Sequence, residues 1–234
     1  SNGLVVFLSN VQNSSTFIIK NSELDSNFVN YGEKEYYNKV LNGQDGGIVI
    51  KGVNIANNST GIEIGENSGN DNSTNSGYEN CFLSLDSIKI IQFTTGMLIN
   101  SFNTYVLAFN NMNILYNNDN IVYGSVDNEN SGENIQFNNC HIGESTNNAV
   151  LFNQAAELFF NNCSFDFNNI LCTMNKPNCE LTVTNGHIEN NNTIVKSNAQ
   201  DSYSVVKFNE TKFFQKINTE YFSGFMFLNL SNCT

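Results

Sequence analysis

The chain has 234 residues, enough for one domain with a continuous hydrophobic core. Its ten basic residues are all lysine and oppose 22 acidic residues, and the net charge of −12 argues against nucleic-acid or anionic-membrane binding. Hydrophobic residues make up 40% and aromatic residues 12%, which excludes a disordered chain.

No targeting or membrane-spanning segment is expected. Residues 1–10 have no basic region and no small-residue cleavage site, and the apolar stretch at 221–230 has about half the length that a bilayer requires. Residues 230–233 begin a further copy of the repeat described below, with no cap after it. The chain is therefore expected to be part of a longer protein or to be capped by a neighbouring subunit.

A six-residue pattern recurs along the chain: an apolar residue, two polar or small residues (often Asn-Asn), two variable positions and a second apolar residue. Copies lie at 50–55, 85–90, 109–114, 137–142, 160–165, 183–188 and 208–213, with an earlier candidate copy at 19–24. Subtraction places their first residues 23 to 35 positions apart. Such a period, built from short alternating segments, is typical of a β-solenoid.

The alternation predicts which side chains face inward. Ile135 and Phe137 would point into the molecule and Gln136 outward, and the apolar side of one coil is buried only when further coils stack on it. Neither helical periodicity nor the hairpin spacing of a sandwich is present. We therefore predict an all-β, right-handed parallel β-helix over residues 1–234, with coils of roughly 22–28 residues and a few inserted loops.

One corner of each coil is predicted from the column of residues that stacking would align. Asparagine suits it because it tolerates left-handed backbone geometry and its amide can bond the next coil. The column consists of Asn21, Gly52, Ser87, Asn111, Asn139, Asn162, Asn185 and Glu210.

In its repeated segments, of which residues 133–142 are the clearest example, the chain resembles the pectin-lyase-like superfamily of right-handed parallel β-helices. The resemblance covers nearly the whole chain but includes no catalytic signature of a particular family. It implies extracellular or virion-borne work on glycans, because members include polysaccharide lyases and hydrolases, bacteriophage tailspike depolymerases and adhesins. The tailspike kind also implies association of parallel chains, such as a homotrimer.

Three segments exceed the repeat length and are predicted to be insertions: 26–47, 65–80 and 123–132. Insertions in solenoids tend to emerge on one side and wall a binding groove. Tyr31, Tyr36 and Tyr37 lie in the first insertion and are candidate substrate-binding residues, because aromatic faces stack on sugar rings. The alternative is that the insertions have no binding role.

The two histidines, His141 and His187, fall in one outward-facing column with Ser164 on the coil between them. Two residues further along the same face lie Asp166 and Glu189, on adjacent coils. Glu144 and Lys212 would lie at the margins of this patch.

The patch suggests glycoside hydrolysis, which needs two carboxyl groups beside the scissile bond. Asp166, Glu189, Glu144, His141 and His187 are therefore the candidate catalytic residues, and Ser164 and Lys212 are candidate substrate contacts. A solvated face with incidental charges is the alternative. No cofactor is predicted, and a zinc site is not expected because the two histidines lie two coils apart.

Six cysteines leave the redox compartment open. Cys140 and Cys163 would stack on adjacent coils and are expected to be buried free thiols. Cys172 and Cys179 bound a short turn and are the better candidates for a disulfide.

The sequence thus predicts an extracellular or virion-borne protein that binds a polysaccharide or cell-surface glycan. If it is an enzyme, hydrolysis is favoured over elimination, because the arginine on which lyases of this superfamily usually rely is absent. The alternative is a non-catalytic surface adhesin or structural fibre.

Overall fold

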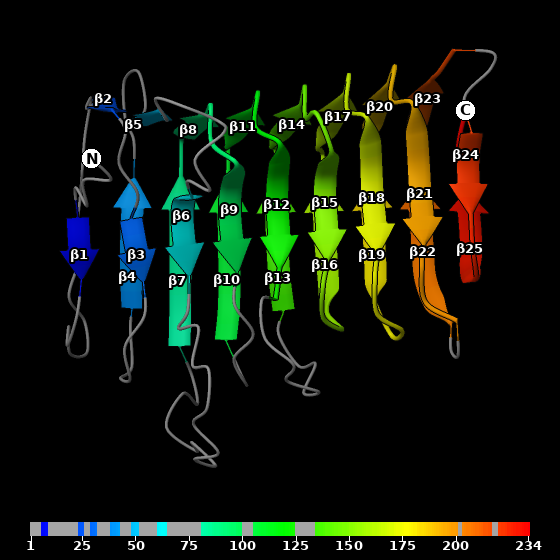
Figure 1. Ribbon diagram of the computed structural model, residues 1–234, viewed down its shortest axis with the longest axis horizontal. Coiled ribbons are helices and arrows are strands. Elements are labelled where there is room, and N and C mark those ends of the chain that lie inside the picture. Colours follow the sequence, from blue (N-terminus) through cyan, green and yellow to red (C-terminus); the bar gives the residue numbers. More distant parts are fainter. Residues whose placement is uncertain are drawn as a thin grey trace.

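A computed structural model describes residues 6–8, 23–25, 29–31, 38–42, 48–51, 60–64, 81–99, 105–124, 134–200, 203–216 and 220–234. These residues form three parallel sheets, and each coil adds one strand to each sheet. The coils lie side by side along the long axis of the molecule, from the N-terminal to the C-terminal end (Figure 1). The predicted all-β, right-handed parallel β-helix is confirmed.

The nine strands of sheet A are, in spatial order, β1 (Val6–Leu8), β3 (Val29–Tyr31), β6 (Thr60–Ile64), β9 (Thr95–Ile99), β12 (Asp119–Tyr123), β15 (Asn148–Phe152), β18 (Ile170–Met174), β21 (Thr193–Ser197) and β24 (Glu220–Ser223). The eight strands of sheet B are β2 (Glu23–Asp25), β5 (Ile48–Lys51), β8 (Ile88–Ile91), β11 (Asn113–Leu115), β14 (His141–Gly143), β17 (Ser164–Asp166), β20 (His187–Glu189) and β23 (Lys212–Phe214). The eight strands of sheet C are β4 (Asn38–Asn42), β7 (Cys81–Asp86), β10 (Tyr105–Asn110), β13 (Asn134–Asn138), β16 (Glu157–Asn161), β19 (Glu180–Thr184), β22 (Ser204–Asn209) and β25 (Met226–Ser231).

The core is a set of columns of like side chains, because equivalent residues of successive coils are hydrogen-bonded neighbours. Phe109, Phe137 and Phe160 are fully buried and stack with ring centroids 4.7 Å apart at each step. Ile135 and Phe137 face inward as predicted, whereas Gln136 between them is partly exposed. Such columns bury apolar area that no coil could bury alone.

The predicted asparagine corner joins sheet C to sheet B. Its residues from Ser87 to Glu210 all have left-handed φ values, between 51° and 58°. The backbone N–H of Asn139 donates to Asn161 O and that of Asn162 donates to Thr184 O, so each corner is bonded to the following coil. The side chain of Asn185 donates to Asn162 Oδ1. This part of the sequence prediction is confirmed.

The predicted insertions are only partly described. Residues 29–31 and 38–42 of the segment 26–47 form β3 and β4 and so belong to the coils. Tyr123 ends β12 and is buried, with Gly124 in a left-handed turn after it. Residues 65–80 and 125–133 lie outside the described residues, so the insertions there stay predictions.

Candidate functional site

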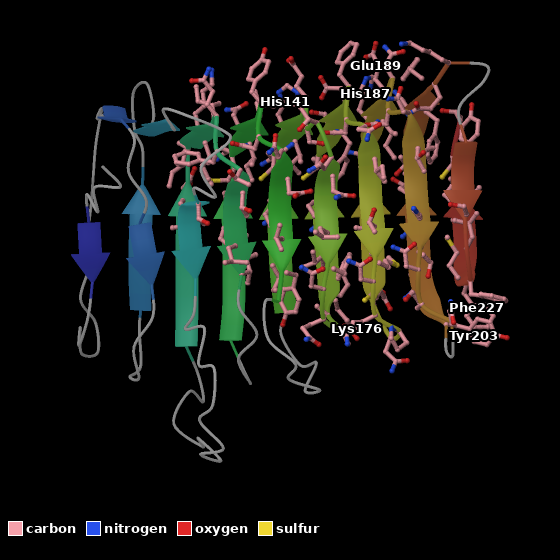
Figure 2. All side chains as sticks on the ribbon, in the orientation of Figure 1. His141, Lys176, His187, Glu189, Tyr203 and Phe227 are labelled. Atoms are coloured by element: carbon pink, nitrogen blue, oxygen red, sulfur yellow. The ribbon has the colours of Figure 1, made fainter. Side chains whose placement is uncertain are left out.

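The outer face of sheet B carries the predicted patch. His141 is the register partner of Ser164, Ser164 of His187, and His187 of Lys212. These residues therefore form one column along the axis, as the repeat spacing predicts. Both histidines are partly exposed, and Figure 2 shows His141, His187 and Glu189 at the same edge of the molecule.

Asp166 and Glu189 form the neighbouring column on the same face. They are register partners on adjacent coils, and both side chains are partly exposed. Glu144 follows Gly143, the partner of Asp166 on the preceding coil. The repeat thus brings together all the candidate residues of the patch, with Lys212 exposed at its margin.

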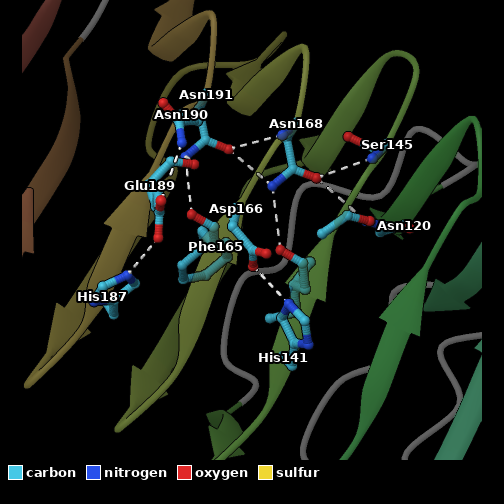
Figure 3. Close-up of polar contacts among 12 residues, drawn as sticks. Asn120, His141, Ser145, Phe165, Asp166, Asn168, His187, Glu189, Asn190 and Asn191 are labelled. Atoms are coloured by element: carbon cyan, nitrogen blue, oxygen red, sulfur yellow. Dashed lines mark hydrogen bonds and ion pairs between the residues drawn. The ribbon is translucent and has the colours of Figure 1, made fainter. Parts of the chain in front are cut away.

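A short contact joins His141 to Asp166 on the adjacent coil. Nε2 of His141 lies 2.6 Å from Oδ1 of Asp166, and the two side chains are 38% and 18% exposed (Figure 3). Gly143 provides the room for this contact. A Cβ atom at Gly143 would lie 2.9 Å from the backbone oxygen of Asp166, 3.2 Å from Asp166 Oδ1 and 3.3 Å from His141 Nε2.

The hydrogen bond to Asp166 raises the pKa of His141 above its ordinary value of 6.5. Desolvation opposes this rise, and the charges of Asp166 and Glu144 add to it. A raised pKa in the folded state means that the pair stabilises the protein fully below about pH 6.5. That contribution is lost as the pH rises through the pKa of the folded state.

Replacing Gly143 with Ala should separate His141 from Asp166, because the added methyl group would press on the Asp166 backbone oxygen and on both atoms of the side-chain contact. The pKa of His141, measured by NMR titration of its ring protons, should fall toward 6.5 in Gly143→Ala and in Asp166→Asn. Ser164→Ala, next to His141 on the following coil, is the matched control and should leave that pKa unchanged. A raised pKa that persists in both Gly143→Ala and Asp166→Asn would contradict the pairing.

The second histidine pairs within its own strand. Nε2 of His187 lies 3.1 Å from Oε2 of Glu189, and Asn190 Nδ2 donates to the other carboxylate oxygen at 3.1 Å (Figure 3). The ring of His187 also stacks on Phe214, with centroids 4.9 Å apart and an interplanar angle of 28°. Both carboxylates of the patch therefore have a histidine partner.

A second left-handed corner, which the sequence analysis missed, borders the patch where sheet B ends. Tyr116, Glu144, Phe167 and Asn190 occupy it on successive coils, with φ values from 50° to 57°. Left-handed geometry costs a non-glycine residue roughly 1–2 kcal/mol and is rare for bulky side chains. Tyr116 and Phe167 are nevertheless 46% and 54% exposed. A hydrogen bond to Glu144 raises the pKa of Tyr116.

Buried asparagines support this corner from inside. Asn117, Asn168 and Asn191 are each at most 1% exposed and follow the corner residues on their coils. Asn168 Oδ1 accepts from the backbone N–H of Ser145 at 3.1 Å, and Asn191 Oδ1 accepts from that of Asn168 at 3.1 Å (Figure 3). The internal ladder satisfies backbone groups that the turn would otherwise leave unpaired. The only sequence signal for it is asparagine recurring two residues after the sheet B strand.

The predicted tyrosine contacts stay predictions. Tyr31 ends β3, for which the backbone alone is described. Tyr36 and Tyr37 lie outside the described residues. Among the described residues, Tyr116, Phe167 and Phe214 are exposed aromatic residues close to the carboxylates.

The suggested Cys172–Cys179 disulfide is wrong: both cysteines are free and buried. Cys172 points into the core from β18, and its pKa is raised by burial. Cys179 lies just before β19, where its thiol contacts the carbonyl oxygens of Gln154 and Lys176. Burial raises the pKa of Cys179 to about 11. Cys140 and Cys163 are buried free thiols, as predicted.

The described residues contain no group of three or more His, Cys, Asp and Glu side chains arranged to hold a metal ion. They also contain no apolar helix of membrane-spanning length. Comparison with known proteins found no matching family model, no similar curated protein and no similar solved structure.

Proposed function

We propose that the protein is an extracellular or virion-borne polysaccharide-binding β-helix. The main support is the outer face of sheet B, where a pair of carboxylates on adjacent coils lies beside exposed aromatic rings. Aromatic rings provide stacking surfaces for sugars, and carboxylates accept hydrogen bonds from sugar hydroxyls. The same proposal includes kinship with the pectin-lyase-like superfamily and assembly into a homotrimer of the tailspike kind.

We further propose that Asp166 and Glu189 are the carboxyl pair of a glycoside hydrolase. Adjacent strands place their backbones about 4.8 Å apart, from which the side chains can reach either of the two separations that such enzymes use. Glu189 would protonate the leaving glycosidic oxygen, and Asp166, oriented by His141, would attack the anomeric carbon or activate a water molecule. Water then adds its hydroxyl group to the anomeric carbon, which releases a reducing end.

A non-catalytic adhesin is the second candidate, and one observation favours it. Each carboxylate of the pair is already bonded to a histidine, at 2.6 Å for Asp166 and 3.1 Å for Glu189. Such bonds could fix the carboxylates as hydrogen-bond acceptors for sugar hydroxyls without any proton transfer.

Incubation with a panel of capsular and plant polysaccharides separates these functions. Hydrolysis should release reducing ends without the ultraviolet absorbance of unsaturated products, whereas elimination would produce both. Binding in affinity electrophoresis without any new reducing ends would support the adhesin. If the protein neither binds nor cleaves any polysaccharide of the panel, glycan recognition itself is contradicted.

A further inference from the structure

The exposed aromatic residues beside the carboxylates lie on alternate coils. Tyr116 and Phe167 occupy the same corner with one coil between them, and Phe214 lies two coils beyond Phe167, one residue before that corner. They are 46%, 54% and 54% exposed. The coil order is fixed by the register Leu115, Gly143, Asp166, Glu189, Phe214.

The intervening coils carry polar side chains at this corner. Glu144 lies between Tyr116 and Phe167, and Asn190 lies between Phe167 and the coil of Phe214. The edge of the patch therefore alternates between a ring and a hydrogen-bonding group. Adjacent coils are one strand spacing apart, about 4.8 Å, so rings on alternate coils recur about every 9.5 Å along the axis.

A stacking contact holds one of these rings in place on the surface. Phe214 stacks on His187, which is itself bonded to Glu189. A ring held in this way loses little conformational freedom when a ligand binds.

Building on the proposed glycan recognition, we infer that the ligand is an extended glycan with a two-sugar repeat, of the β-1,4-linked kind, lying parallel to the solenoid axis. In such a chain successive sugars are turned over, so every second sugar presents the same face. Its disaccharide length is close to the two-coil spacing of the rings. Alternate sugars would stack on the aromatic rings, and the sugars between them would hydrogen-bond to Glu144 and Asn190.

The span of the rings sets the length of ligand that is recognised. Tyr116 and Phe214 are four coils apart, about 19 Å, which corresponds to five sugars of an extended chain. Affinity should therefore rise with each ring reached and level off at five to six sugars. An α-1,4-linked chain of the same sugars coils and cannot meet rings that recur every two coils along a straight axis.

The first test compares cellohexaose with maltohexaose, which differ only in linkage, by isothermal titration calorimetry. Chitin hexasaccharide is included because it keeps the β-1,4 linkage and has an acetamido group in place of the C2 hydroxyl of each sugar. We expect at least one β-1,4-linked hexasaccharide to bind ten times more tightly than maltohexaose, with affinity reaching its plateau at five or six sugars. Equal or tighter binding of maltohexaose would overturn the inference but leave glycan recognition standing. If no oligosaccharide or panel polysaccharide binds, the inference and the proposed function both fail.

A register-shifted variant provides the second test. Phe167→Asn/Asn190→Phe moves one ring by one coil between two positions that both have left-handed backbones, at φ values of 56° and 50°. Composition and net charge are unchanged. Affinity for the preferred β-1,4-linked hexasaccharide should fall about tenfold in this variant and in Phe167→Asn, with an unchanged far-ultraviolet circular dichroism spectrum. Wild-type affinity in the shifted variant would show that ring spacing does not select the ligand.

Discussion

Replacing Asp166 with Asn and Glu189 with Gln should lower the rate of glycan hydrolysis by roughly a thousandfold or more, because acid–base and nucleophilic catalysis both require ionisable groups. Each substitution keeps the shape of the side chain, so binding of the glycan should persist. The rate is measured as reducing ends released under single-turnover conditions, with the polysaccharide that the panel identifies. Glycan binding is measured in parallel by affinity electrophoresis.

Sheet C offers a matched control for this pair. Glu157 and Glu180 are also register partners on adjacent coils, so Glu157→Gln/Glu180→Gln removes the same charge at the same spacing on another face. The control should keep the wild-type rate. Equal losses of rate in both double variants would mean that net charge, and not the Asp166–Glu189 pair, governs activity. An unchanged rate in both variants would exclude these carboxyl groups from the chemistry.

Replacing Asn168 with Ala should destabilise the protein by roughly 3 kcal/mol, because it leaves several buried polar groups without partners. The Asn168 amide donates to Ile142 O at 3.1 Å and accepts from the Ser145 backbone N–H at 3.1 Å. It also bonds to the side chains of Asn120 and Asn191. Urea denaturation followed by circular dichroism measures the change in the free energy of unfolding.

The neighbouring residue provides the control. Asn169 is exposed, and its side chain accepts a single hydrogen bond, from Asn192 at 3.2 Å. Asn169→Ala should therefore cost less than about 1 kcal/mol. Equal effects of Asn168→Ala and Asn169→Ala would show that the internal ladder adds nothing beyond a surface amide.

The coil register could be predicted from sequence because burial and stacking act on the same positions in every coil. Phe137 and Phe160 must both face inward, and once they are aligned, His141, Ser164 and His187 follow in one column. The Asn139 corner was also predictable, since asparagine has an intrinsic preference for left-handed geometry.

The second corner could not be predicted, because its residues oppose their usual preferences. Phe167 is exposed in a left-handed conformation, although propensity places a phenylalanine in a strand or in the core. Asn168 is fully enclosed, although most asparagines lie on protein surfaces. Its position is explained by the backbone groups to which it is hydrogen-bonded, and those groups come together only in the folded turn.

Since each coil returns the chain to the same corners one strand spacing further on, the molecule is modular. Equivalent residues such as Asn162 and Asn185 are 23 positions apart and directly bonded. Excising or duplicating one such unit would shorten or extend the solenoid by about 4.8 Å and rejoin matching ends. Insertions or deletions of this size in the gene would therefore change the length of the ligand-facing surface in fixed steps, while the neighbouring coils keep their contacts.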